Sequence, residues 1–523
     1  MAAISPAPRA NRWVRALPLA LIIAVGVALR LYLIADKSLW LDEAFSVWMG
    51  RQPLGAMLGY LVQLDQHPPL YYTLLHFWMW LGDSETVVRG FSALWSILTL
   101  PVLYAIGVRI GGRALGLLAV LILALSPLHI QYAQDARMYA MLTFSASMAM
   151  LCIVRLLEDP QRQAPSTERR DWAGGAWCLM LGTQSRWWLG LVVFTMLTMF
   201  GHNTALLFPV ALGLFIAGAY GLPALMRRAR GAAQPDRRLR NWSIALAVAL
   251  LLWLPWLPGL LVQVRRVDAE FWIPPPTLRS VSATLRDFLS AFAPSGPLMA
   301  LAELALSAIV LLGAWRLRHR PALLFLLLLL IAVPFAGELL ISVRRPIYYT
   351  RTLIWASIPL YLLLAAGLLQ LRFRPLIVAA TLALVLLNGV SLVGYYRDYE
   401  PEGWRDAANW LAPQVRAGDI ILFNAGWTQI PFDYYYRRVG PPVEERGLPA
   451  DMFDRGILEP KMAAADLPRL ADLIAGRRRI WLVYSHDWYT DAHGIIPSYL
   501  DVTLDKQTER AFNGLNIIVY QQR

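Results

Sequence analysis

The sequence predicts an α-helical polytopic membrane protein with about eleven transmembrane helices and a small C-terminal extracytoplasmic α/β domain. Three observations predict this class. The 523 residues are 57% hydrophobic and only 16% charged, whereas soluble domains are about 45–50% apolar and roughly 25% charged. Apolar segments of about the length that spans a bilayer recur along the first three quarters of the chain. The last part contains none of them, and its short apolar runs are typical of strands.

Eleven apolar segments reach or approach the roughly 20 residues that a helix needs to cross the hydrocarbon core. The first follows three arginines and could pass for a signal peptide, but no small-residue cleavage pattern follows it, so we interpret it as a retained helix. The predicted spans are residues 16–35, 87–108, 114–130, 138–157, 187–201, 203–221, 242–260, 297–315, 321–342, 352–371 and 375–394.

The chain has a net charge of +13, but the positions of its arginines argue against nucleic-acid binding. They form short runs between the apolar segments. Arginine-rich loops face the cytoplasm in membrane proteins. With a cytoplasmic N-terminus, every second loop is basic, and the odd number of spans places the C-terminus outside. The basic loops contain Arg109 and Arg113, Arg162, Arg169 and Arg170, the segment 227–240, Arg316 and Arg318, and Arg372 and Arg374.

The chain divides into a membrane domain, residues 1–396, and an extracytoplasmic domain, residues 397–523. Within the second domain an amphipathic helix is predicted over residues 406–415. Buried strands are predicted at 420–423, 480–484 and 515–520. The two cysteines, Cys152 in a span and Cys178 near a cytoplasmic loop, are not expected to form a disulfide.

Carboxylates and a histidine stand out in the first outer loop, residues 36–86. Asp42 and Glu43 follow the first span closely and are either a solvated loop face or a catalytic pair. The low dielectric near a membrane would raise their pKa and favour a role as base. The two prolines after His67 fix an extended segment and hold this histidine at the membrane surface.

Six arginines lie in outer loops, against the positive-inside bias. Each could extend its charge to the membrane surface, or several could converge on a phosphate. The neighbouring aromatic rings would form an interfacial belt or pack against sugar rings and isoprenoid chains. His202 is a helix cap or a ligand. These candidate binding residues are His67, Arg137, Tyr139, His202, Arg265, Arg266, Arg344, Arg345, Tyr348, Tyr349 and Arg351.

The order of these motifs resembles the bacterial family 39-like branch of the GT-C membrane glycosyltransferases, over residues 30–400. The resemblance rests on Asp42-Glu43, on His-Pro-Pro-Leu-Tyr-Tyr at 67–72, on Gln-Asp-Ala-Arg-Met-Tyr-Ala at 134–140 and on Arg-Pro-Ile-Tyr-Tyr-Thr-Arg at 345–351. This family includes the relatives of protein O-mannosyltransferases and of the lipid A aminoarabinose and galacturonic-acid transferases.

The resemblance implies an inverting transfer of a sugar from a polyprenyl phosphate to an envelope glycan, lipid or protein acceptor, on the outer face of the bacterial inner membrane. Asp42 matches the presumed base, Asp135 matches the second acidic position, and Glu43 is a further candidate catalytic carboxylate. The late arginines would hold the donor phosphate. His67 stands where some relatives have lysine. We expect no nucleotide, no nucleic acid and no essential metal, although some relatives use a divalent cation.

Two other classes remain open. A transporter or flippase of lipid-linked or anionic substrates would carry ionisable residues inside its spans. In this sequence such residues gather in the outer loops, and Glu303 and Glu338 are rare exceptions within spans. A sensory membrane protein with a sugar-binding outer domain would not need Asp42. The sequence identifies neither the sugar nor the acceptor.

Overall fold

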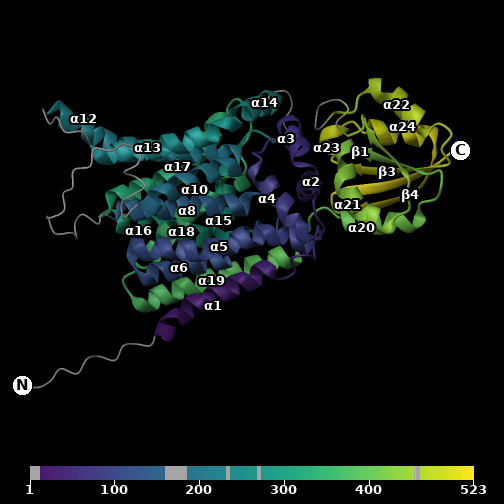
Figure 1. Ribbon diagram of the computed structural model, residues 1–523. Coiled ribbons are helices and arrows are strands. Elements are labelled where there is room, and N and C mark those ends of the chain that lie inside the picture. Colours follow the sequence, from purple (N-terminus) through teal and green to yellow (C-terminus); the bar gives the residue numbers. More distant parts are fainter. Residues whose placement is uncertain (1–11, 159–184, 231–235, 268–272, 453, 455–459) are drawn as a thin grey trace, which may run out of the picture.

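The structure is a computed structural model that describes residues 12–158, 185–230, 236–267, 273–452, 454 and 460–523. A body of long helices carries the C-terminal domain at one end, beside the short helices α2, α3 and α4 (Figure 1). The N-terminal helix α1 and the late helix α19 lie along the same side of the body (Figure 1). This arrangement places the polar first outer loop between the body and the domain.

Each predicted span contains helix in the described part of the chain, although the first helix ends at Leu31, before the predicted end at residue 35. Eight helical stretches there are long and apolar enough to cross a membrane, and α1 and α6 contain shorter apolar helices. The helices that correspond to the predicted spans are α1 (Arg12–Leu31), α5 (Glu85–Gly111), α6 (Arg113–Leu125), α8 (Tyr139–Leu157), α10 (Ser185–Gly201), α11 (Leu207–Ile216), α13 (Arg237–Trp253) continued by α14 (Leu257–Val267), α16 (Pro297–Leu317), α17 (Pro321–Ser342), α18 (Ser357–Leu368) and α19 (Arg374–Arg397).

Helices α16 and α18 show how the spans pack. A Cβ atom added to Gly313 would lie 1.8 Å from the carbonyl oxygen of Leu363, and one added to Gly367 would lie 1.8 Å from that of Ile309. Only glycine permits two backbones to approach this closely, which is a common device between membrane helices.

The first outer region, predicted from the sequence only as a loop, is helical. It forms α2 (Leu41–Gly50), α3 (Leu54–Gln63) and α4 (Leu70–Trp78), and the 3₁₀ turn Met79–Leu81 follows. Pro53 precedes α3 and Pro69 precedes α4, as expected for a residue that starts helices but breaks their interior. These helices are not evident from the sequence because each is only 9 or 10 residues long.

The C-terminal domain is a five-stranded sheet with helices on both faces, as the predicted α/β class requires. The strand order is β2-β1-β3-β5-β4, with β1 parallel to β2 and β3, and β5 antiparallel to β3 and β4. The strands are β1 (Ile420–Asn424), β2 (Glu444–Leu448), β3 (Arg479–Ser485), β4 (Asp505–Phe512) and β5 (Leu515–Gln521), and the main helices are α20 (Trp404–Leu411), α21 (Gln429–Val439), α22 (Leu467–Ile474) and α24 (Ile495–Thr503).

The predicted strands at 420–423, 480–484 and 515–520 are confirmed as β1, β3 and β5, and the predicted helix at 406–415 corresponds to α20. The two edge strands escape prediction because their sequences, Glu-Glu-Arg-Gly-Leu and Asp-Lys-Gln-Thr-Glu-Arg-Ala-Phe, are rich in charged residues, and β4 is almost entirely exposed. Charge on an edge strand prevents pairing with other chains, and it also removes the apolar run that marks a strand.

Hydrogen bonds fasten the domain to the first outer region. The hydroxyl of Tyr435 accepts a hydrogen bond from the backbone N–H of Leu39 at 2.7 Å, and a carboxylate oxygen of Glu402 accepts one from the N–H of Leu41 at 2.9 Å. The guanidinium of Arg405 donates to the carbonyl oxygens of residues 35, 36 and 37 and to the carboxylate of Glu85. The domain therefore holds the segment that leads directly into α2.

Candidate active site

A cavity of about 270 Å³ lies where α2, the segment before α8 and the C-terminal domain meet. Its walls combine carboxylates, two arginines, a lysine and aromatic rings from segments that are distant in sequence. The membrane domain contributes Trp40, Asp42, Glu43, Asp135, Tyr349 and Arg351, and the C-terminal domain contributes Glu402, Trp427, His486, Trp488 and Tyr489. This cavity brings together the three predicted catalytic carboxylates.

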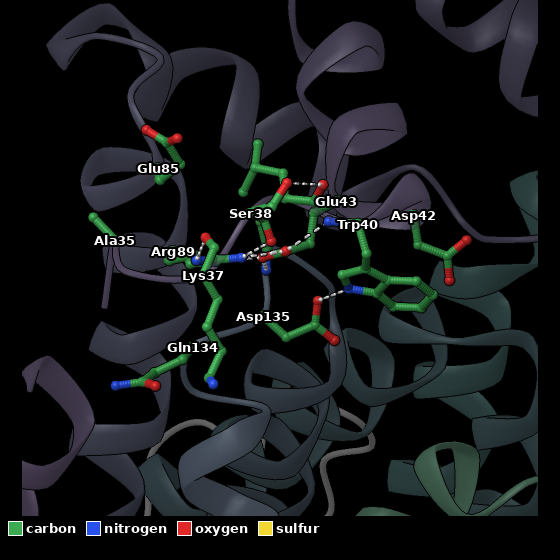
Figure 2. A network of polar contacts seen from close by, with 12 residues as sticks. Ala35, Lys37, Ser38, Trp40, Asp42, Glu43, Glu85, Arg89, Gln134 and Asp135 are labelled. Atoms are coloured by element: carbon green, nitrogen blue, oxygen red, sulfur yellow. Dashed lines mark hydrogen bonds and ion pairs between the residues drawn. The ribbon is translucent and has the colours of Figure 1, made fainter. Parts of the chain in front are cut away.

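Asp42 and Glu43 are neighbours in the first turn of α2 and point in different directions (Figure 2). Successive helical side chains are about 100° apart, from 3.6 residues per turn, so the two carboxylates meet different surroundings. Glu43 is 1% exposed. Its two oxygens accept hydrogen bonds from Arg89 at 2.7 and 2.6 Å and from the N–H of Ala136 at 2.9 Å.

This geometry favours a positioning role for Glu43, and its catalytic role stays a prediction. Arg89, which pairs with it, also donates to the carbonyl oxygens of Ile34, Lys37 and Ser38. The pair thus ties α5, the segment before α2 and the segment before α8 to one point. A carboxylate with both oxygens engaged in this way positions its neighbours, and Asp42 is the one left facing the cations.

Asp42 lies between two arginines. Its Oδ2 atom is 3.1 Å from Nη1 of Arg351 and 4.0 Å from Nε of Arg137. Burial raises the pKa of Asp42, but the charges of Arg137 and Arg351 outweigh it and leave this pKa below its ordinary value. The raised pKa expected for Asp42 from the membrane interface is therefore wrong, because two cations converge on this carboxylate.

Arg137 links Asp42 to a histidine behind it. Its guanidinium donates to the hydroxyl of Tyr72 at 3.0 Å and lies 3.4 Å from both ring nitrogens of His67. The Nδ1 atom of His67 is 2.8 Å from a carboxylate oxygen of Asp65. Burial raises the pKa of Asp65, but His67 and Arg137 bring it down to about 2. Asp65 is therefore ionised and fixes the His67 ring.

The His202 ring packs against the His67 ring, and its Nδ1 atom caps the backbone of the turn that follows it. Its ring lies 5.0 Å from that of His67, and its Nδ1 accepts a hydrogen bond from the N–H of Thr204 at 3.2 Å. Burial and the nearby cations place the pKa of His202 well below its ordinary value. The geometry agrees with the helix-cap alternative.

Asp135 faces the same cavity from the segment before α8. One of its oxygens accepts a hydrogen bond from the indole Nε1 of Trp40 at 3.1 Å (Figure 2). Burial and the negative charge of Glu43 raise the pKa of Asp135 to about 7, although Arg137 and Trp40 oppose the shift. Asp135 thus changes charge near neutral pH, whereas Asp42 is ionised there.

The other predicted arginines lie elsewhere. Arg265 and Arg344 are exposed, Arg345 donates to the carbonyl oxygen of Val264 at 2.6 Å, and none of the three lines the cavity. The side chain of Arg266 lies outside the described residues. Arg351, in contrast, lies over the rings of Tyr349, Trp40 and Tyr139 at 4.8, 5.4 and 5.8 Å. Its position agrees with the prediction, and phosphate binding by the others stays a prediction.

Tyr348 and Tyr349 border a second cavity of about 410 Å³ that also contacts Gln131, Tyr132 and Asp287. Because Gln131, Tyr132 and Tyr349 line both cavities, the two adjoin each other.

Several residues of the site are not predicted from the sequence. Asp65 could have been found from the sequence, since it lies two residues before His67. Arg89 and Lys37 could not have been found in this way, because each is a single cation near the end of a span. Glu402 and His486 belong to the C-terminal domain, and only the folded chain brings them to the cavity.

Within the described ranges, no group of three or more His, Cys, Asp and Glu side chains could hold a metal ion. The expectation that no metal is essential stays a prediction.

Comparisons with known proteins agree on the architecture. Residues 47–209 match the family model described as dolichyl-phosphate-mannose-protein mannosyltransferase. The structure is similar to ArnT from Cupriavidus metallidurans in the apo state, with a TM-score of 0.61 and 16% identity over 97% of this chain and 98% of that chain. The same protein bound to undecaprenyl phosphate gives a TM-score of 0.58 and 14% identity over 96% and 98% of the two chains.

The archaeal oligosaccharyltransferase AglB from Archaeoglobus fulgidus, in complex with an inhibitory peptide and a dolichol phosphate, is also similar. Its TM-score is 0.55, with 11% identity over 98% of this chain and 74% of that chain. No curated protein sequence matches the chain. The likeness therefore extends over nearly the whole fold, including the C-terminal domain, while sequence identity is low.

Proposed function

We propose that this chain, whose fold is that of the GT-C membrane glycosyltransferases, is an inverting glycosyltransferase. It moves a sugar from a polyprenyl-phosphate-linked donor to the hydroxyl group of an envelope glycan, lipid or protein acceptor. The reaction takes place on the extracytoplasmic face of a bacterial inner membrane. The chain itself is a multi-pass membrane protein.

The observation that carries this proposal is the position of Asp42 at the edge of the cavity with Arg351 and Arg137 beside it. An inverting transfer needs a base for the acceptor and positive charge at the leaving phosphate. Asp42 removes the proton of the acceptor hydroxyl, whose oxygen attacks the anomeric carbon. The bond from this carbon to the phosphate oxygen breaks, and its electron pair leaves with the polyprenyl phosphate.

The two arginines have a second effect. While they face Asp42, they lower its pKa and make it a weak base. A donor phosphate that binds Arg351 takes part of this positive charge, so the pKa of Asp42 rises when the donor is in place. Donor binding thus prepares the base. Arg351 suits this task because its planar guanidinium presents several donors to phosphate oxygens.

The experiment that tests the function uses purified protein in lipid nanodiscs with a panel of polyprenyl-phosphate-linked sugars and an extract of envelope glycans and lipids. We expect release of polyprenyl phosphate coupled to a product in which the anomeric configuration is inverted. Mass spectrometry of envelopes from cells with and without the protein identifies the acceptor. A donor that crosses the bilayer of reconstituted vesicles without being consumed would favour the transporter alternative and contradict the proposal.

A further inference from the structure

Glu338 is a buried carboxyl group that the proposed reaction does not use. It lies in the span α17 and is 0% exposed, and its Oε2 atom is 2.8 Å from the hydroxyl oxygen of Thr352. Its other polar neighbours are the side chain of Thr204 and the backbone of Tyr349, and among the described residues no cation forms an ion pair with it. A buried charge without a countercharge is very costly. These surroundings therefore favour a neutral Glu338.

The hydrogen bonds of Thr352 show where the proton of Glu338 lies. The Thr352 hydroxyl oxygen is 2.8 Å from Glu338 and 2.7 Å from the carbonyl oxygen of Tyr349. The carbonyl oxygen can only accept, and the hydroxyl has a single hydrogen to donate. Both contacts are favourable only when the hydroxyl donates to Tyr349 and a protonated Glu338 donates to the hydroxyl. Two hydrogen bonds in series then join α17 to the backbone at Tyr349.

The segment that receives these hydrogen bonds carries Arg351. It is the start of the 3₁₀ helix Thr350–Ala356, which follows Tyr349 directly. Tyr349 and Thr352 therefore flank Arg351 in the chain, and the hydrogen bond between them closes the turn that presents its guanidinium. Arg351 in turn lies 3.1 Å from Asp42. The contact of Glu338 with Thr352 thus bears directly on the direction of Arg351.

Other contacts hold the same turn at its ends. The hydroxyl of Ser342, also in α17, accepts hydrogen bonds from the backbone N–H groups of residues 347 and 348 at 3.0 and 3.1 Å. The hydroxyl of Thr350 lies 3.0 Å from that of Thr284 in α15 (Leu278–Ser290). Because these contacts remain when Glu338 is replaced, its loss should change the direction of Arg351 without unfolding the turn.

We propose that Glu338 is a protonated positioning residue, whose hydrogen bond to Thr352 fixes the turn so that Arg351 faces Asp42 and the incoming donor phosphate. This inference rests on the proposed transferase function and adds a residue to its donor site. It also gives a carboxyl group inside a span a role other than transport, because a neutral carboxyl group carries no charge to relay.

The test compares Glu338→Leu, Glu338→Gln and Thr352→Val in the full-length protein. Leucine fills the space without a polar group, whereas glutamine keeps an N–H that can donate to the Thr352 hydroxyl. Thr381→Val is the matched control, since the Thr381 hydroxyl in α19 also donates to a backbone carbonyl oxygen, that of Ile377 at 2.7 Å, and Thr381 lines neither cavity. Donor affinity is measured by titration with a polyprenyl-phosphate-linked sugar, and the thermal unfolding midpoint is measured on the same samples.

We expect donor affinity to fall about three- to tenfold in Glu338→Leu and in Thr352→Val, since one hydrogen bond is lost in each. Glu338→Gln and Thr381→Val should bind the donor within about twofold of the wild type. The unfolding midpoint of Glu338→Leu should be no lower than that of the wild type, because an apolar side chain suits this buried site. In an Arg351→Ala background, Glu338→Leu should cause no further loss of affinity.

Three results overturn this inference while the transferase function stands. They are unchanged donor affinity in both Glu338→Leu and Thr352→Val, a loss in Glu338→Gln as large as in Glu338→Leu, and a full further loss when Glu338→Leu is added to Arg351→Ala. A wild-type protein that neither binds nor hydrolyses the donor overturns both the inference and the proposed function.

Discussion

Asp42 and Arg351 form an ion pair at 3.1 Å although they are 309 residues apart in the chain. The pair joins the start of α2 to the 3₁₀ turn that opens the helix ending in α18. Its side chains are partly exposed, 26% for Asp42 and 15% for Arg351. The base and the phosphate-binding cation of the proposed reaction therefore neutralise each other until the donor arrives.

Asp42→Asn should remove transfer while the donor still binds at least as tightly as in the wild type, because asparagine no longer neutralises Arg351. A general base supplies about 10²–10⁴-fold in rate, and asparagine keeps the shape of the side chain without its basicity. The measurement is single-turnover transfer by purified protein, with donor affinity determined on the same sample. Turnover above about a tenth of the wild-type value would show that another group is the base.

Arg351→Ala should weaken donor binding about 10- to 100-fold, because a charged hydrogen bond to phosphate contributes about 1.5–3 kcal/mol. Arg344→Ala is the matched control, since Arg344 is exposed and does not line the cavity. A titration with the donor separates the two variants. Equal losses in both would place the phosphate away from the cavity, nearer the membrane surface.

Glu43→Gln should lower the stability of the folded protein, in addition to any effect on the rate of transfer. Its neutral side chain would leave the buried Arg89, which is 3% exposed, without its countercharge. Breaking a buried ion pair typically costs about 3–5 kcal/mol. Thermal unfolding in detergent should therefore show a lower midpoint for Glu43→Gln than for its neighbour Asp42→Asn, and Arg89→Gln should add little to Glu43→Gln. A fully stable but inactive Glu43→Gln protein would return this residue to a catalytic role.

Donor affinity should fall as the pH rises from about 6 to 8. The pKa of Asp135 is raised to about 7, so this carboxyl is protonated and neutral below that pH and gains a negative charge above it. The donor is a phosphodiester with one negative charge throughout this range, so the change belongs to the protein. We expect a loss of about three- to tenfold by repulsion within the cavity. Asp135→Asn should bind the donor equally well at both pH values, and a persistent dependence in that variant would implicate another group.

The orientation derived from the arginines can be tested at Ser498, an exposed residue of α24. A single cysteine there, in a variant without Cys152 and Cys178, should react with a membrane-impermeant thiol reagent in cells whose outer barrier alone is permeabilised. Ser498 is a better position than Gly494, whose φ angle of 63° disfavours any side chain. Labelling only after lysis of the inner membrane would place the domain in the cytoplasm and contradict the proposed site.

The sequence was sufficient for the spans and for the central strands, because both depend on apolar runs that need no partner to be recognised. It also proposes Asp42 as the base, and that role stays a prediction. It did not separate Asp42 from Glu43, because the difference depends on Arg89, 46 residues further along, and on the direction of each side chain from α2. The sequence likewise grouped Arg344 with Arg351, although only the turn between them decides which one reaches the cavity.

The contacts of Glu402 and Arg405 have a consequence for the order in which the site is built. The segment before α2 is synthesised first, but its hydrogen-bond partners Glu402 and Arg405 follow about 360 residues later, since Leu41 and Glu402 are 361 positions apart. At the usual rate of about 5–20 residues per second, the nascent chain carries Asp42 for many seconds before the C-terminal domain can hold α2 in place. The site of the proposed reaction is therefore complete only after the C-terminal domain has folded, and we expect a chain that ends before Glu402 to consume no lipid-linked donor.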